Sequence, residues 1–215
     1  MENKREREIY LFDFDGTLVD SMNVYAPMMV KILEDFGIPH GDDIIKIITP
    51  LGYKGTAEYY ISLGVDKTVD ELLAIMKEKA EYAYGHLIDE KEGVIDTVKA
   101  LKARGAELNV LTASPHSSLD PCMKRLGIWD LFTNVWSCDD FGTTKADPEI
   151  YTAAAERIGA PKDKIIFVDD NINAVKTAKL AGMVSYGIYD ESADEYVDEM
   201  KSASDRYIYK LSELI

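Results

Sequence analysis

The chain has 215 residues, of which 47% are hydrophobic and 29% are charged. This is enough apolar material for one full domain with a smaller insertion, and it excludes a disordered chain. With 24 basic and 39 acidic residues the net charge is −15, so nucleic acid and anionic membrane surfaces are poor partners. No secretory signal or membrane-spanning run is recognisable, and we expect a cytoplasmic protein with a monomer as the default state.

The first predicted element is a buried parallel strand over residues 9–14, which stops at a tight polar loop. Four similar apolar runs predict strands at 108–112, 134–137, 165–169 and 184–188, and helical periodicity lies at 94–104, 116–126, 147–158 and 171–181. This alternation predicts an α/β fold with a doubly wound, mainly parallel sheet.

The region between the first two strands departs from this alternation. Residues 21–88 carry only helical patterns, and about seventy residues of helix are too many for a simple crossover. We therefore predict two domains, an α/β core of residues 1–20 and 89–215 and an inserted all-helical cap of residues 21–88.

Polar residues follow several of the predicted strands. Period-two alternation indicates that Asp13 and Asp15 project to one side, and Asp170 follows a neighbouring strand. Crowded carboxylates require raised pKa values or a divalent cation, and Mg²⁺ suits hard oxygen ligands. Lys145, the Thr112 hydroxyl and the Ala113 backbone N–H then offer donors to phosphoryl oxygens, so a cation-bridged phosphate is the natural ligand.

Each of these residues also has a purely structural interpretation. An isolated aspartate at a strand end is most often a turn former or a helix cap, and an isolated lysine is usually solvated. The pattern Asp-x-Asp-Gly-Thr at residues 13–17 is more specific, because four fixed residues arise by chance in only about one of 10³ chains of this length.

Four segments resemble the ordered motifs of the haloacid dehalogenase-like hydrolases: Asp13–Ser21, Leu111–Ser114, Lys145–Pro148 and Phe167–Asn171. The resemblance extends from about residue 9 to the last predicted strand. A helical insertion directly after the first motif is similar to the cap of the phosphoglycolate phosphatase and β-phosphoglucomutase branch.

The resemblance implies a role for each matching residue. Asp13 would be the nucleophile that becomes an aspartyl-phosphate, and Asp15 would be the general acid and base. Mg²⁺ would be held by Asp13, the backbone carbonyl of Asp15 and Asp170. The phosphoryl group would be bound by Thr112, Ala113 and Lys145. Asp169 and Asn171 would position these ligands without contacting the metal.

Two positions depart from the family pattern. Ala174 occupies a place where a further supporting aspartate is common, which puts the strength of metal binding in question. Tyr25 stands twelve residues beyond Asp13, where the mutase branch carries histidine.

The leading hypothesis is a Mg²⁺-dependent phosphatase that hydrolyses a small soluble phosphate monoester. A sugar-phosphate mutase of the β-phosphoglucomutase type is one alternative, and a non-catalytic phospho-acceptor or binding module is another. Candidate specificity residues in the cap are Tyr25, Tyr53 and Lys54. Aromatic residues at helical spacing more often pack in a core, and Lys54 could equally be an exposed lysine without a role in binding.

Overall fold

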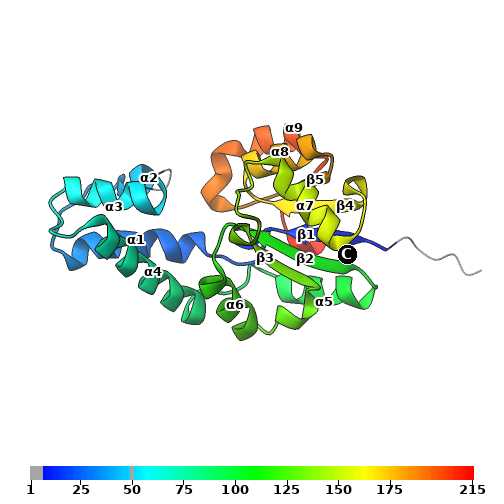
Figure 1. The fold of residues 1–215 in the computed structure, drawn as a ribbon, viewed down its shortest axis with the longest axis horizontal. Helices are drawn as coiled ribbons and strands as arrows, with labels where there is room; N and C mark the ends of the chain where they lie inside the picture. The colour runs from blue at the N-terminus through cyan, green and yellow to red at the C-terminus, as the bar shows by residue number, and fades with distance from the viewer. Residues whose placement is uncertain (1–6, 49–50) are drawn as a thin grey trace, which may run out of the picture. The chain divides into compact units, whose positions relative to one another are not determined.

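The computed structural model describes residues 7–48 and 51–215. The chain forms two compact units, one joining the segment that ends at Asp20 with Asp89–Ile215, and the other consisting of Ser21–Ile88. Figure 1 shows the elements of both.

The first unit is built on a six-stranded parallel sheet with the strand order β3-β2-β1-β4-β5-β6. The strands are β1 (Ile9–Phe12), β2 (Glu107–Thr112), β3 (Asn134–Ser137), β4 (Ile165–Asp169), β5 (Val184–Ile188) and β6 (Arg206–Ile208). The predicted α/β fold with a parallel sheet is confirmed. The short strand β6 was missing from the sequence prediction, since three residues leave too little pattern to detect.

Helices cover both faces of this sheet. They are α5 (Val94–Ala103), α6 (His116–Arg125), α7 (Pro148–Ile158), α8 (Ile172–Ala181) and α9 (Val197–Ala203). Figure 1 shows α5 and α6 on one face and α7 and α8 on the other. On the latter face, Leu11 and Phe167 pack with Tyr151 in one buried cluster. β1 is buried along its whole length because it lies between β2 and β4 and beneath both helical layers.

Side-chain caps fix where the helices near the strand ends begin. The Asp147 carboxylate accepts a hydrogen bond from the backbone N–H of Glu149, with Pro148 in the first turn of α7. The Asn171 side chain accepts hydrogen bonds from the N–H groups of Asn173 and Ala174 at the start of α8. These caps place Lys145 and Asp170 in short loops directly ahead of helices.

The described residues of the second unit hold α1 (Met22–Asp35), α2 (Ile44–Ile48), α3 (Gly52–Ser62) and α4 (Val69–His86). They enclose a core of their own, in which the buried Tyr60 hydroxyl donates a hydrogen bond of 2.8 Å to the carbonyl of Met29. Thr68 and Glu71 form a capping box at the start of α4. Across the described ranges, no helix combines the length and apolarity needed to cross a bilayer.

Candidate active site

Three aspartates converge at the carboxyl ends of β1 and β4. Asp13 directly follows β1, and its backbone N–H donates a hydrogen bond of 2.9 Å to the carbonyl of Val168. Asp169 is the last residue of β4, and Asp170 is the next residue. Because parallel strands end at the same edge of a sheet, carboxylate oxygens of Asp13, Asp169 and Asp170 lie within 4.8 Å of one another.

Lys145 faces this cluster from the loop before α7. Its Nζ lies 2.5 Å from Asp13 Oδ1 and 2.7 Å from Asp169 Oδ2, and the side chain is 13% exposed. The Tyr151 hydroxyl donates to the Lys145 carbonyl at 3.0 Å and so fixes its backbone. Burial disfavours the charged ammonium, but Asp13 and Asp169 outweigh that effect and raise the pKa of Lys145. Lys145 is therefore a fixed positive charge.

Crowding makes the carboxylates hard to ionise together. Burial, and then the charge of Asp169, raise the pKa of Asp13 to about 7, although Lys145 lowers it. Burial followed by the charges of Asp169, Asp13 and Asp190 raises the pKa of Asp170 well above its ordinary value. When all three clustered aspartates are ionised, the one ammonium of Lys145 leaves two negative charges in excess.

This arrangement fits a divalent cation with hard oxygen ligands. Within the described part of the chain, Asp13 Oδ1 is buried and accepts no hydrogen bond of regular geometry, although it forms the ion pair with Lys145. A buried carboxylate oxygen with an unused lone pair, next to Asp170, offers the ligands that Mg²⁺ prefers. Asp169 is committed to Lys145 and to the Asn171 backbone N–H at 2.7 Å, which fits a supporting role.

Asp15 is not one of the three clustered carboxylates. Its Oδ2 accepts a hydrogen bond of 2.5 Å from the Ser114 hydroxyl at the end of β2. The side chain therefore lies between the ends of β1 and β2, half-buried and beside the cluster. The predicted use of its backbone carbonyl as a metal ligand stays a prediction.

The loop after Asp15 is packed directly against Asp170. Gly16 has a φ of 71°, and a Cβ at this position would lie 2.4 Å from Asp170 Oδ2. The Thr17 hydroxyl donates a hydrogen bond of 3.2 Å to Asp170 Oδ1. Glycine is required here both by the left-handed backbone and by the absence of room for a side chain.

The other predicted residues of the first unit also lie near the strand ends. Thr112 is buried at the end of β2, and its hydroxyl oxygen accepts a hydrogen bond of 3.0 Å from the Ser114 N–H. Ala113 follows it and is exposed. The side chain of Asn171 caps α8, and its backbone N–H donates to Asp169 Oδ1 at 2.7 Å. Ala174 is buried in α8, and its carbonyl lies 3.1 Å from the Tyr151 hydroxyl.

The three candidate specificity residues belong to the second unit. The rings of Tyr25 and Tyr53 meet edge to face with centroids 5.8 Å apart. The Lys54 side chain is 77% exposed, and its Nζ lies 3.8 Å from Glu58 Oε1. Their roles stay predictions.

Three residues beside the site were not predicted from the sequence. Ser114 lies within the recognised motif Leu111–Ser114, but its contact with Asp15 requires β1 and β2 to be neighbours in the sheet. Thr17 belongs to the loop after Asp13 and Asp15, and its hydroxyl contacts Asp170. Lys91 gave no signal, because its ammonium reaches the Gly16 carbonyl from 75 residues away in the chain.

Comparisons with known proteins identify relatives over most of the chain. The family model of haloacid dehalogenase-like hydrolases matches residues 10–188. Pyrophosphatase PpaX of Bacillus velezensis is 29% identical over 190 residues, covering 87% of this chain and 85% of that protein. Phosphoglycolate phosphatase of Escherichia coli is 28% identical over 211 residues, covering 87% and 83%. The structure of the HAD-hydrolase YfnB of Bacillus subtilis bound to magnesium superposes with a TM-score of 0.81 at 19% identity, covering 98% and 97%.

The chain therefore belongs to the haloacid dehalogenase-like hydrolases. The expected resemblance to the branch with a helical cap is confirmed, and so is the expectation of an enzyme of the hydrolase class.

Proposed function

We propose that the protein is a Mg²⁺-dependent phosphatase that hydrolyses small soluble phosphate monoesters through an aspartyl-phosphate at Asp13. The observation that carries this proposal is the convergence of Asp13, Asp169 and Asp170 at the ends of adjacent parallel strands, with Lys145 paired to Asp13 and Asp169. The names of two relatives support a phosphatase of small substrates: phosphoglycolate phosphatase acts on a phosphate monoester, and pyrophosphatase PpaX on a phosphoric anhydride.

The reaction divides into two transfers of the phosphoryl group. In the first, an Asp13 oxygen attacks phosphorus, the bond to the ester oxygen breaks, and Asp15 donates a proton to the departing alcohol. In the second, Asp15 accepts a proton from the water that attacks the aspartyl-phosphate. Inorganic phosphate leaves, and the Asp13 carboxylate is restored. The hydrogen bond from Ser114 supports this role, because it fixes the carboxyl of Asp15 beside Asp13.

Binding of the phosphoryl oxygens falls to residues at neighbouring strand ends. An ammonium has three N–H donors, so the contacts of Lys145 with Asp13 and Asp169 are compatible with a third to phosphate. The Thr112 hydroxyl and the Ala113 N–H would serve the remaining oxygens. Asp13, Asp170 and the Asp15 carbonyl would hold Mg²⁺, which supplies electrostatic stabilisation to the phosphoryl charge.

The test is hydrolysis of an aryl phosphate and of a panel of sugar phosphates, nucleotides, phosphorylated small acids and pyrophosphate, with Mg²⁺ and with EDTA. Asp13→Asn is expected to lower kcat by at least about 10³-fold. Asp163→Asn is the matched control, because this exposed aspartate lies before β4 at the opposite end of the strand. Absence of turnover throughout, or an Asp13→Asn variant as active as the wild type, overturns the proposal.

The same assay separates the two alternatives. A mutase would require a bisphosphate activator and would isomerise a sugar phosphate without releasing phosphate. A phospho-acceptor module would keep its acyl-phosphate, whereas a phosphatase hydrolyses it rapidly.

A further inference from the structure

Lys91 makes an unusually complete set of contacts for a residue in a linker. Its Nζ donates to the Gly16 carbonyl at 2.6 Å, to the Tyr189 carbonyl at 2.7 Å and to Asp190 Oδ2 at 2.9 Å. These three acceptors match the three N–H donors of an ammonium. The Lys91 side chain is 20% exposed and the Asp190 side chain is 6% exposed, so the ion pair is shielded from water.

These contacts join three segments that are far apart in the chain. Lys91 itself belongs to the stretch that returns from the second unit, and its backbone N–H donates to the Leu18 carbonyl at 3.1 Å. Gly16 belongs to the loop that follows the nucleophile, and Tyr189 and Asp190 follow β5. Without the ammonium, two carbonyls and one carboxylate in this shielded place would lose a shared donor.

The Gly16 contact matters because the glycine backbone touches Asp170. The space at Gly16 is so narrow that an added Cβ would lie 2.4 Å from Asp170 Oδ2. A small shift of the Gly16 carbonyl therefore changes the separation between the first loop and Asp170. Asp13 and Asp15 lie on the same short loop and would move with it.

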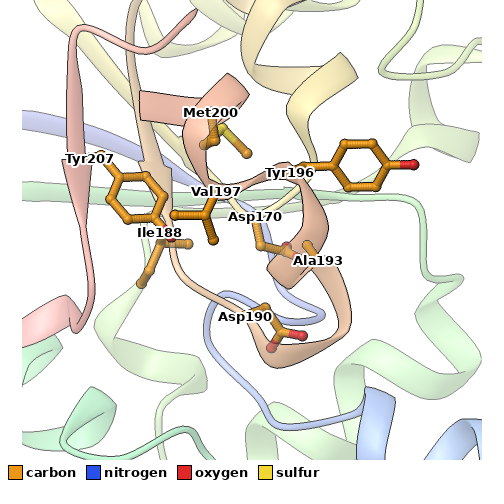
Figure 2. Close-up of a pocket in the computed structure, with 8 residues that line it drawn as sticks. All are labelled: Asp170, Ile188, Asp190, Ala193, Tyr196, Val197, Met200 and Tyr207. Atoms are coloured by element: carbon orange, nitrogen blue, oxygen red, sulfur yellow. The ribbon is translucent and has the colours of Figure 1, made fainter. Parts of the chain in front are cut away.

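Asp190 brings a second negative charge close to Asp170. Both residues border one small pocket, together with Ile188 and Tyr207 (Figure 2). The Lys91 ammonium compensates this charge, as Lys145 does for Asp13 and Asp169.

We propose that Lys91 is a positioning residue of the catalytic site, which holds the Asp13–Gly16 loop against Asp170 through the Gly16 carbonyl. The inference rests on the proposed phosphatase function. Lys91 acts through the backbone and through Asp190, so its loss is expected to affect turnover and Mg²⁺ binding more than substrate binding.

The experiment compares Lys91→Met and Lys91→Arg with Lys210→Met. Lys210 is a matched control, because its Nζ forms an ion pair of 2.7 Å with Glu92, the residue next to Lys91, while its side chain is 55% exposed. The quantities to measure are kcat and KM for the aryl phosphate, at a temperature well below the melting temperature of every variant, and the Kd of Mg²⁺ alone by calorimetry. Hydrogen exchange is followed in the peptide that contains Gly16–Val19.

Lys91→Met is expected to lower kcat by about 10- to 100-fold with KM changed by less than about threefold, and to weaken Mg²⁺ binding about tenfold. Its Gly16–Val19 amides are expected to exchange faster, because the backbone hydrogen bond from Gly16 to Val19 loses its support. Lys91→Arg is expected to retain more activity, and Lys210→Met to behave as the wild type.

A Lys91→Met protein that melts earlier but keeps its kcat within about twofold and its exchange rates unchanged overturns the inference. Should that variant not fold, Lys91→Gln takes its place, because its amide has too few N–H donors for all three acceptors, and wild-type kcat and exchange in that variant overturn the inference equally. If the wild type hydrolyses no phosphate ester, the proposed function fails, while the exchange rates still decide whether Lys91 holds the loop.

Discussion

At the scale of single residues, the site depends most sharply on Gly16. Its φ of 71° is unfavourable for any side chain, and a Cβ would also collide with the Asp170 carboxylate. We expect Gly16→Ala to lower the free energy of unfolding by about 1–2 kcal/mol from backbone strain. Displacement of Asp170 is expected to lower kcat by about 10²-fold in addition.

Gly105 offers a matched control for Gly16. It has a φ of 87°, and a Cβ there would meet no atom within 4 Å among the described residues. Gly105→Ala should therefore show the same loss of stability in thermal melting with unchanged kcat. Equal kcat values for Gly16→Ala and Gly105→Ala would contradict the packing argument.

At the scale of elements, an imidazole connects the start of α6 to the short 3₁₀ helix η3 (Cys138–Phe141). His116 Nδ1 lies 2.7 Å from Asp120 Oδ1, and Nε2 lies 2.8 Å from Asp140 Oδ2. Hydrogen bonds to Asp120 and then to Asp140 raise the pKa of His116, while burial opposes the shift. Both ring nitrogens can donate only in the protonated form.

This linkage predicts a pH dependence of stability with a definite sign. Because the pKa of His116 is raised in the folded state, its stabilisation is complete below the unfolded pKa of about 6.5 and is lost as pH rises through the folded pKa. The side chain is 39% exposed, so we expect only about 0.5–1 kcal/mol. The measurement is thermal melting of wild type and His116→Gln from acidic to alkaline pH. A stability difference between them that stays constant with pH would contradict the assignment.

At the scale of the whole molecule, the separate helical unit is where we expect substrate choice to be influenced. Lys54 and Lys77 are matched lysines in this unit, each exposed and each 3.8 Å from a glutamate four residues later. Replacing either lysine removes one exposed ion pair and should lower the free energy of unfolding by a similar, small amount. We expect Lys54→Ala to alter the ratio of kcat/KM between two substrates of the panel by about tenfold, since Lys54 neighbours the Tyr25–Tyr53 pair. An unaltered ratio, or the same change in Lys77→Ala, would contradict the role of Lys54.

Much of this architecture could be predicted from the sequence, because strand-end chemistry is local. Asp13, Thr112 and Asp169 each end or follow an apolar run, and parallel strands bring such ends together. The order of the strands required the structure. Lys91 could not be found, because no local pattern records a contact made across 75 residues by a flexible side chain. Ser114 belongs to a recognisable motif, but its hydrogen bond to Asp15 could not be predicted, since the orientation of a hydroxyl depends on the fold.

The same limit applies to the acidic stretch 190–195. Such a composition is typical of a solvated helix, and the Asp190 side chain caps a 3₁₀ helix by accepting a hydrogen bond from the Ser192 N–H. Asp190 is also buried and forms an ion pair with Lys91, a contact that composition alone does not reveal. Charge runs therefore need to be resolved residue by residue.

Acid quenching tests most directly whether Asp13 carries the phosphoryl group. In Asp15→Asn, an aryl phosphate can still transfer its phosphoryl group to Asp13, because the aryl leaving group needs no proton. Hydrolysis of the resulting aspartyl-phosphate is slowed, because the general base is lost. We predict that mass spectrometry of the quenched Asp15→Asn protein finds one phosphoryl group on Asp13, and that Asp13→Asn in the same background carries none. A phosphoryl group on another residue, or turnover in Asp13→Asn at the wild-type rate, would contradict the account.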